Sequence, residues 1–134
     1  LQIIKKLVSD LNFNIKILSI PAIRENSGLV FSSRNAKISK NNLKNASQLY
    51  QILNSAKNHI LTSKSIDLKE ILDDTRKQLS NYFDKIEYLE ICREDNLKII
   101  DKFDAKVKSR IFVAVYLQSV RLIDNIEIIS TKDE

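Results

Sequence analysis

The chain has very little glycine or proline: among its 134 residues, Gly28 and Pro21 are the only ones of their kinds. Phosphate-binding loops of the P-loop and dinucleotide-binding types need several glycines at fixed spacing, so both types are excluded. A nucleotide phosphate would instead have to be held by side chains or by a helix N-terminus. Because the two residues lie close together, the sequence predicts one clear break, between positions 21 and 28.

Cysteine, methionine and long apolar runs are also scarce. The single Cys92 rules out a disulfide within the chain and favours a reducing compartment, so we expect a cytoplasmic protein. No apolar run approaches the roughly 18 residues that a membrane span needs, and the first residues lack the pattern of a signal peptide. We therefore expect no membrane partner. Since Met is absent even at position 1, we expect that the chain begins inside a longer polypeptide or was processed.

The charge balance is basic, with 22 Lys and Arg against 17 Asp and Glu and a net charge of +5. The lysines are scattered, whereas a nucleic-acid surface concentrates them and interleaves aromatic residues. This pattern favours an ordinary solvated surface and no nucleic-acid partner. A basic RNA-associated module, or a structural interaction module without catalysis, is the alternative interpretation.

The first 22 residues have the pattern of a helix followed by a strand. Apolar residues recur at helical spacing over Leu1–Leu11. A β-branched run over Ile15–Ile20, ended by Pro21, predicts a buried strand. A lone strand cannot satisfy its own backbone hydrogen bonds. We therefore predict that residues 1–22 are the trailing edge of an α/β domain whose other elements this chain does not contain.

Two amphipathic helices are predicted beyond an irregular segment at 23–38. Ser39 is a good N-cap for the first, which runs to about Leu61. The second starts at Asp67, with Glu70 three residues later in the arrangement of a capping box.

Period-two alternation then predicts three strands, at Ile86–Ile91, Arg110–Leu117 and Val120–Ile129. Only Gln118 and Ser119 separate the last two, a pair that suits a tight hairpin less well than Asn-Gly. We therefore predict a small α+β domain over residues 23–134, with helices covering one face of a three-stranded antiparallel sheet.

The run Ser32-Ser33-Arg34-Asn35 brings two hydroxyls, a guanidinium and an amide together in a turn-rich stretch. Hydroxyls donate hydrogen bonds, and the Arg fork suits phosphate oxygens and keeps its charge at any relevant pH. In a chain so poor in glycine, this run is the best candidate for binding an anion. A capped surface loop is the simpler interpretation of these four residues alone.

Three longer stretches resemble the pantothenate synthetase (pantoate–β-alanine ligase) family. Ile20–Asn35 is similar to the family run "P-x-x-R-E-x-D-G-L-A-M-S-S-R-N", and this match is the most specific. Ile86–Glu90 resembles the "D-Y-x-E" strand, and Arg121–Ile126 resembles "T-R-L-I-D-N-I". The three matches occur in family order and extend over nearly the whole chain.

The resemblance implies a reaction and a fold. The family uses ATP, with Mg²⁺ as the substrate complex and no tightly bound cofactor, to convert pantoate to a pantoyl adenylate and pyrophosphate. The amine of β-alanine then displaces AMP. The implied fold is a Rossmann-like nucleotidyltransferase domain followed by a smaller C-terminal α+β lid domain. Residues 1–22 would then be the last helix and strand of the first domain, and 23–134 the lid.

The same resemblance implies site residues. Ser32, Ser33 and Arg34 would contact ATP phosphates, with Arg34 stabilising the charge that develops during adenylation. Phe31 would border the nucleotide, and the backbone of Ile23 would meet the adenine.

The sequence also departs from the family pattern. Phe31 replaces Met, Val30 replaces Ala, and Ser27 replaces an acidic residue. The family's "H-x-G-H" motif and general acid histidine are absent from this chain, as is the N-terminal domain that would carry them. Gln2 does not match a pantoate-binding glutamine, and the pantoate-binding residues are not assigned. We therefore expect this piece alone to be inactive; the family resemblance also allows a homodimer.

Other chemically capable residues have simpler interpretations, and no metal site is predicted. His59 is the only histidine and lies near a helix end, which favours a surface or capping role. Cys92 has no His or Cys partner nearby in sequence. The acidic pairs Asp73-Asp74 and Asp101/Asp104 are expected to be solvated. Asp124-Asn125 is expected to be a hydrogen-bonding pair at a strand end, with a substrate role as the alternative.

Overall fold

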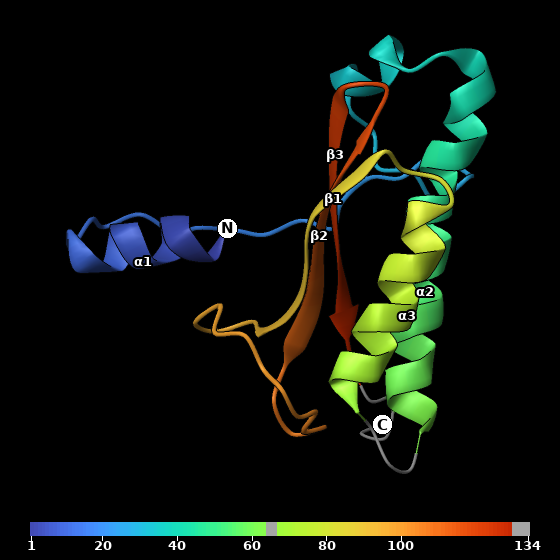
Figure 1. Ribbon diagram of the computed structural model, residues 1–134. Coiled ribbons are helices and arrows are strands. Elements are labelled where there is room, and N and C mark those ends of the chain that lie inside the picture. Colours follow the sequence, from blue (N-terminus) through green and yellow to red (C-terminus); the bar gives the residue numbers. More distant parts are fainter. Residues whose placement is uncertain (64–66, 130–134) are drawn as a thin grey trace.

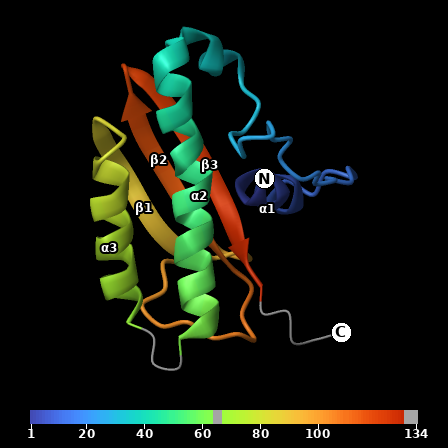
Figure 2. The same cartoon turned by 90° about the vertical axis from the view of Figure 1, so that its right-hand side faces the viewer.

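A three-stranded antiparallel sheet with two helices on one face forms the body of the structure, a computed structural model that describes residues 1–63 and 67–129 (Figure 1). The strands β1 (Lys85–Arg93), β2 (Ser109–Leu117) and β3 (Val120–Ile128) lie in the order β1-β2-β3. The helices α2 (Lys40–Thr62) and α3 (Leu68–Ser80) run along the sheet, α3 against β1 and α2 against β3 (Figure 2). The predicted α+β fold is thus confirmed over the described residues; the predicted domain end, 130–134, lies outside them.

The N-cap residues of α2 and α3 were predicted correctly, but only that of α3 caps its helix with its side chain. Asp67 caps α3, its carboxylate accepting hydrogen bonds from the backbone N–H groups of Lys69 (2.9 Å) and Glu70 (3.4 Å). Ser39 is the N-cap residue of α2, but its hydroxyl makes no capping bond. Its backbone N–H donates instead to Oε1 of Gln118 at 3.1 Å, which ties the start of α2 to the hairpin.

The strands follow the predicted alternation with one interruption. In β1 the register slips between Ile86 and Tyr88, a β-bulge that puts Ile86 and Leu89 toward the helices. The β2–β3 hairpin turns through Gln118 (φ 50°) and Ser119 (φ 64°), both left-handed, which is the geometry that Asn-Gly favours.

The core lies between the two helices and the sheet. Burying each of its large aliphatic side chains contributes about 1.5–3 kcal/mol. Its fully buried members come from every layer: Leu49, Leu53 and Ile60 of α2, Leu68 and Leu79 of α3, and Leu89, Ile91, Ile111, Val113 and Val115 of the strands. None of the described helices is both long and apolar enough to cross a membrane.

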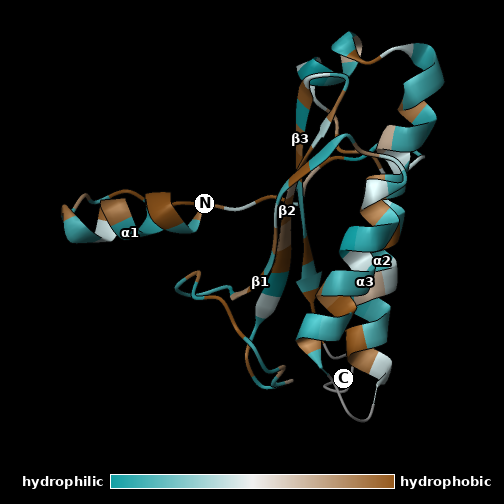
Figure 3. Cartoon of the chain, viewed as in Figure 1, coloured by the Kyte–Doolittle hydropathy of each residue, from teal (hydrophilic) through white to brown (hydrophobic). Residues whose placement is uncertain are grey.

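Residues 1–22 lie apart from this body, on the side of the sheet away from α2 and α3 (Figure 1). The predicted first helix is present as α1 (Gln2–Asp10), which has an apolar stripe but no buried residue (Figure 3). The predicted strand over Ile15–Ile20 is absent: these residues form neither helix nor strand, and Ile20 is 84% exposed. The strand does not form because the described residues place no second strand beside it to share hydrogen bonds.

Candidate functional site

The segment that follows Pro21 folds into a tight turn over residues 24–30. The backbone of Arg24 pairs with that of Val30, and the N–H of Phe31 donates to the carbonyl of Ile23 at 3.0 Å. Gly28 makes the turn possible with a φ of +90°, a conformation that other residues rarely adopt. The result places Ile23 and Phe31 next to each other, and the two residues are 68% and 62% exposed.

The run predicted to bind an anion forms a short 3₁₀ helix, η1 (Ser33–Lys37), within the segment expected to be irregular. Ser32 is its N-cap, its hydroxyl oxygen accepting from the N–H of Arg34 at 3.2 Å. That hydroxyl retains its own hydrogen for a ligand. Asn35 anchors η1, because its amide nitrogen donates to the carbonyl of Val30 at 2.9 Å. A helix of this length is too short to leave a periodic pattern in the sequence.

Ser32, Ser33 and Arg34 are all exposed on this helix. Within residues 1–63 and 67–129, the guanidinium of Arg34 takes part in no ion pair. The structure therefore presents two hydroxyls and a cation together at the surface, as an anion-binding site requires.

A pocket of about 240 Å³ lies between this segment and β3. Phe31, Ser32 and Arg34 line it, whereas Ile23 and Ser33, the other predicted site residues, do not. The opposite wall is Arg121–Asp124 of β3. Asn35 also faces the pocket, and its buried Oδ1 has no hydrogen-bond partner in the described part of the chain.

An ion pair that the sequence did not reveal holds the segment to the sheet. Arg24 donates to both carboxylate oxygens of Asp124, at 2.7 and 2.8 Å, and to the carbonyl of Gly28 at 3.0 Å. The two side chains are only 19% and 4% exposed. The guanidinium also stacks 4.1 Å from the ring centre of Tyr50 in α2. The hydrogen bond with Asp124 is the main cause that raises the pKa of Arg24.

The prediction that Asp124 and Asn125 lie at a strand end is wrong, because both lie inside β3. Asn125 does act as a hydrogen-bonding residue, its Oδ1 accepting from Arg110 at 2.8 Å. Asp124 shares the buried face of the strand with Leu122 and Ile126. A carboxylate in an otherwise apolar register is a signal of a buried cationic partner, and it could have pointed to Arg24.

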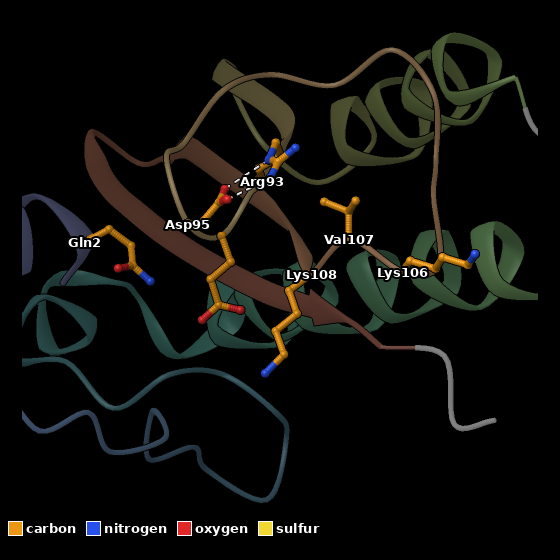
Figure 4. Close-up of a pocket in the computed structure, with 7 residues that line it drawn as sticks. Gln2, Arg93, Asp95, Lys106, Val107 and Lys108 are labelled. Carbon is orange, nitrogen blue, oxygen red and sulfur yellow. Dashed lines mark hydrogen bonds and ion pairs between the residues drawn. The ribbon is translucent and has the colours of Figure 1, made fainter. Parts of the chain in front are cut away.

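A larger pocket, of about 360 Å³, lies at the far end of β1 and is lined by Gln2, Arg93–Asp95 and Lys106–Lys108 (Figure 4). Two of its charged side chains form an ion pair: Arg93 and Asp95 point toward each other and are 2.7 Å apart (Figure 4). The hydrogen bond from Arg93 holds the pKa of Asp95 below its usual value. This pocket contains none of the predicted site residues; Oε2 of Glu94, which lines it, is buried without a hydrogen-bond partner in the described part of the chain.

The remaining candidates have structural surroundings. His59 is exposed in the last turn of α2, and Cys92 is buried in β1, where burial raises the pKa of its thiol. Asp73 and Asp74 pair with the next turn of α3, at 3.5 Å to Arg76 and 3.3 Å to Lys77 respectively. Over the described ranges, no group of three or more His, Cys, Asp or Glu residues could hold a metal ion.

Comparisons with known proteins agree with the fold and the sequence motifs. The sequence model of the family described as pantoate–β-alanine ligase matches residues 1–127. The pantothenate synthetase of Coprothermobacter proteolyticus is 38% identical over 128 residues, which cover 96% of this chain and 45% of that protein. The chain thus spans less than half the length of that relative.

Solved structures show the same relationship. A crystal structure of pantothenate synthetase from Thermus thermophilus matches with a TM-score of 0.83 at 29% identity, over 96% of this chain and 45% of that one. Pantoate–β-alanine ligase from Francisella tularensis, crystallised with beta-gamma ATP and β-alanine, matches with a TM-score of 0.62 at 30% identity, over 92% and 38%. Because sequence and fold both match over nearly all of its residues, the chain belongs to the pantoate–β-alanine ligase family.

Proposed function

We propose that the chain is the C-terminal, ATP-contacting part of an enzyme that joins pantoate to β-alanine. In this reaction a pantoate carboxylate oxygen attacks the α-phosphorus of Mg²⁺-bound ATP, and the bond to pyrophosphate breaks. The amine of β-alanine then attacks the activated carbonyl carbon, and AMP leaves with the electron pair of the C–O bond. A cytoplasmic location, which the lone Cys92 favours, is part of the same proposal.

The observation that carries the proposal is the exposed group formed by Ser32, Ser33 and Arg34 at the start of η1. The hydroxyls donate hydrogen bonds to phosphate oxygens, and the guanidinium fork binds them with charge. Arg34 stabilises the negative charge that develops as the bond to pyrophosphate breaks, and it needs no change in protonation to do so. The ligase from Francisella tularensis, crystallised with beta-gamma ATP, supports an ATP site in this family.

Ile23 and Phe31 form the nucleoside side of the proposed site. Their backbones are joined by the 3.0 Å hydrogen bond, so a base that contacts the backbone of Ile23 lies beside the ring of Phe31. The exposed ring offers an apolar surface for the nucleotide to lie against. Ser32 follows Phe31 directly in the sequence. The proposed contacts therefore run along the chain from the base to the phosphates.

Residues 1–22 are proposed to complete a nucleotide-binding domain that precedes the lid domain, 23–134. The support is the unburied apolar surface of α1 and of Ile15–Ile20, which matches an element built to pack against a partner. With such a partner strand alongside, Ile15–Ile20 can form the strand that its sequence predicts. The chain by itself is then inactive, because the general acid histidine that the family resemblance implies is not among its residues. Its only histidine, His59, is exposed at the end of α2.

The test is a fusion ligase in which this chain replaces the matching part of the Coprothermobacter proteolyticus pantothenate synthetase. We expect the fusion to form pantothenate, AMP and pyrophosphate from pantoate, β-alanine and Mg²⁺-ATP, and the chain alone to form none. Circular dichroism and a cooperative melting transition verify that each protein is folded. A folded fusion without activity, or an active isolated chain, contradicts the proposal.

A further inference from the structure

We propose that Arg24 and Asp124 are positioning residues for ATP: their ion pair fixes the nucleotide-contacting segment to the sheet before ATP arrives. The inference rests on the proposed function of that segment. Both side chains are largely buried, Asp124 4% and Arg24 19% exposed, although Asp124 also contributes to the wall of the pocket beside Phe31. Their main effect on ATP therefore passes through the residues that they hold.

The first step of the argument is where Arg24 lies in the chain. It follows Ile23 directly and pairs by backbone with Val30, which precedes Phe31. Fixing one guanidinium therefore fixes both sides of the turn that presents Ile23 and Phe31. The hydrogen bond from Arg24 to the carbonyl of Gly28 holds the tip of the same turn.

The second step is what Arg24 is fixed to. Asp124 is a buried residue of β3, and Tyr50, on which the guanidinium stacks, belongs to α2. The bidentate contact has a single geometry, unlike the contact of a lysine. One side chain thus joins the turn to both layers of the domain, across 100 residues of sequence.

The third step is that the chain on the N-terminal side of Ile23 gives the turn no support. The chain before Ile23 runs into the exposed stretch that ends at Ile20, where no regular element holds it. On the far side, η1 is anchored to the same turn through Asn35 and Val30. Without the ion pair, the turn keeps its own hydrogen bonds and the buried side chain of Leu29 but loses its bidentate link to β3, so the place of Ser32–Arg34 over the sheet becomes less fixed. Apparent affinity falls in proportion to the fraction of molecules that hold the competent arrangement.

The test compares Arg24→Lys, Asp124→Asn and the double variant in the fusion ligase. We expect each single change to raise the KM for ATP by about tenfold, with kcat and the KM for β-alanine nearly unchanged. The double variant should be no worse than the more severe single variant, because both remove the same contact. In the full chain, the backbone amides of 23–35 should exchange hydrogen faster in Arg24→Lys, whereas those of α3 should not.

Arg76→Lys is the matched control, since Arg76 likewise donates from another element to a strand, to the carbonyl of Leu89 at 2.8 Å, but that strand, β1, is the edge of the sheet opposite β3. It should lower the melting temperature without changing the KM for ATP. If Arg24→Lys changes the KM for ATP no more than Arg76→Lys does, or only lowers kcat through loss of folded enzyme, the positioning role is wrong. An inactive fusion with Arg24 intact would instead overturn the proposed function.

Discussion

Gly28 and Tyr50 are in contact across the base of the turn that Arg24 and Val30 close, with no room between them for a side chain. A Cβ at position 28 would lie 2.3 Å from Cδ1 of Tyr50 and 3.0 Å from its Cγ. The ring cannot move freely, because Arg24 stacks on it at 4.1 Å. The only glycine of the chain therefore lies where both the φ of +90° and the close ring require it.

Gly28→Ala should lower the free energy of unfolding by about 1–3 kcal/mol, because it adds a steric overlap to an unfavourable φ. Urea unfolding of the full chain measures the change. Asn26→Ala, at an exposed position of the same turn, is the control and should stay within about 0.5 kcal/mol of the parent chain. Equal stability of the two variants would show that the turn adjusts without cost.

Cys92 should react slowly with iodoacetamide at pH 8, at least about tenfold more slowly than in the urea-unfolded chain. Burial, assisted by the negative charge of Glu90, raises the pKa of its thiol, so the folded chain holds less thiolate. Because the unfolded chain gives up this proton first, the free energy of unfolding should also fall as the pH rises above the usual value of 9.0. Mass spectrometry follows the modification; equal rates in folded and unfolded chains would contradict the buried position.

Deleting residues 1–22 should change the free energy of unfolding by less than about 0.5 kcal/mol, because no residue of α1 is buried. The same deletion should reduce the binding of an apolar dye, since it removes the exposed apolar stripe. Leu53→Ala is the positive control, with an expected loss of about 2–5 kcal/mol at a fully buried site. A destabilisation by the deletion comparable to that of Leu53→Ala would show that 1–22 belong to the core of this domain.

The regular elements were predictable because their signals are local. The apolar face of α2, the Asp67 cap of α3 and the alternation in β2 each lie within one stretch of sequence, and each was predicted to within a few residues. The strand at Ile15–Ile20 was predicted from equally local signals and is absent. A strand needs a neighbouring strand to pair with, and the strand propensity of a sequence does not show whether one is present.

The candidate site was predictable in part for the same reason. Ser32–Arg34 were recognised from one run of residues, and the structure presents them together at the surface. The contact of Arg24 with Asp124 joins residues 100 positions apart, and the clash that requires glycine at 28 comes from Tyr50 in another element. No periodicity or motif of a single stretch contains such contacts, which form only when the layers pack.

The claim that Ser32–Arg34 bind the phosphates of ATP is tested most directly by pantoate-dependent exchange of pyrophosphate into ATP, measured with the fusion ligase. Arg34→Ala should lower the exchange rate by a factor on the order of 10² or more, as loss of a charged donor to the transition state does. Lys37→Ala, a cation in the same 3₁₀ helix, should leave the rate nearly unchanged. An Arg34→Ala enzyme that exchanges pyrophosphate at the parent rate would contradict the account.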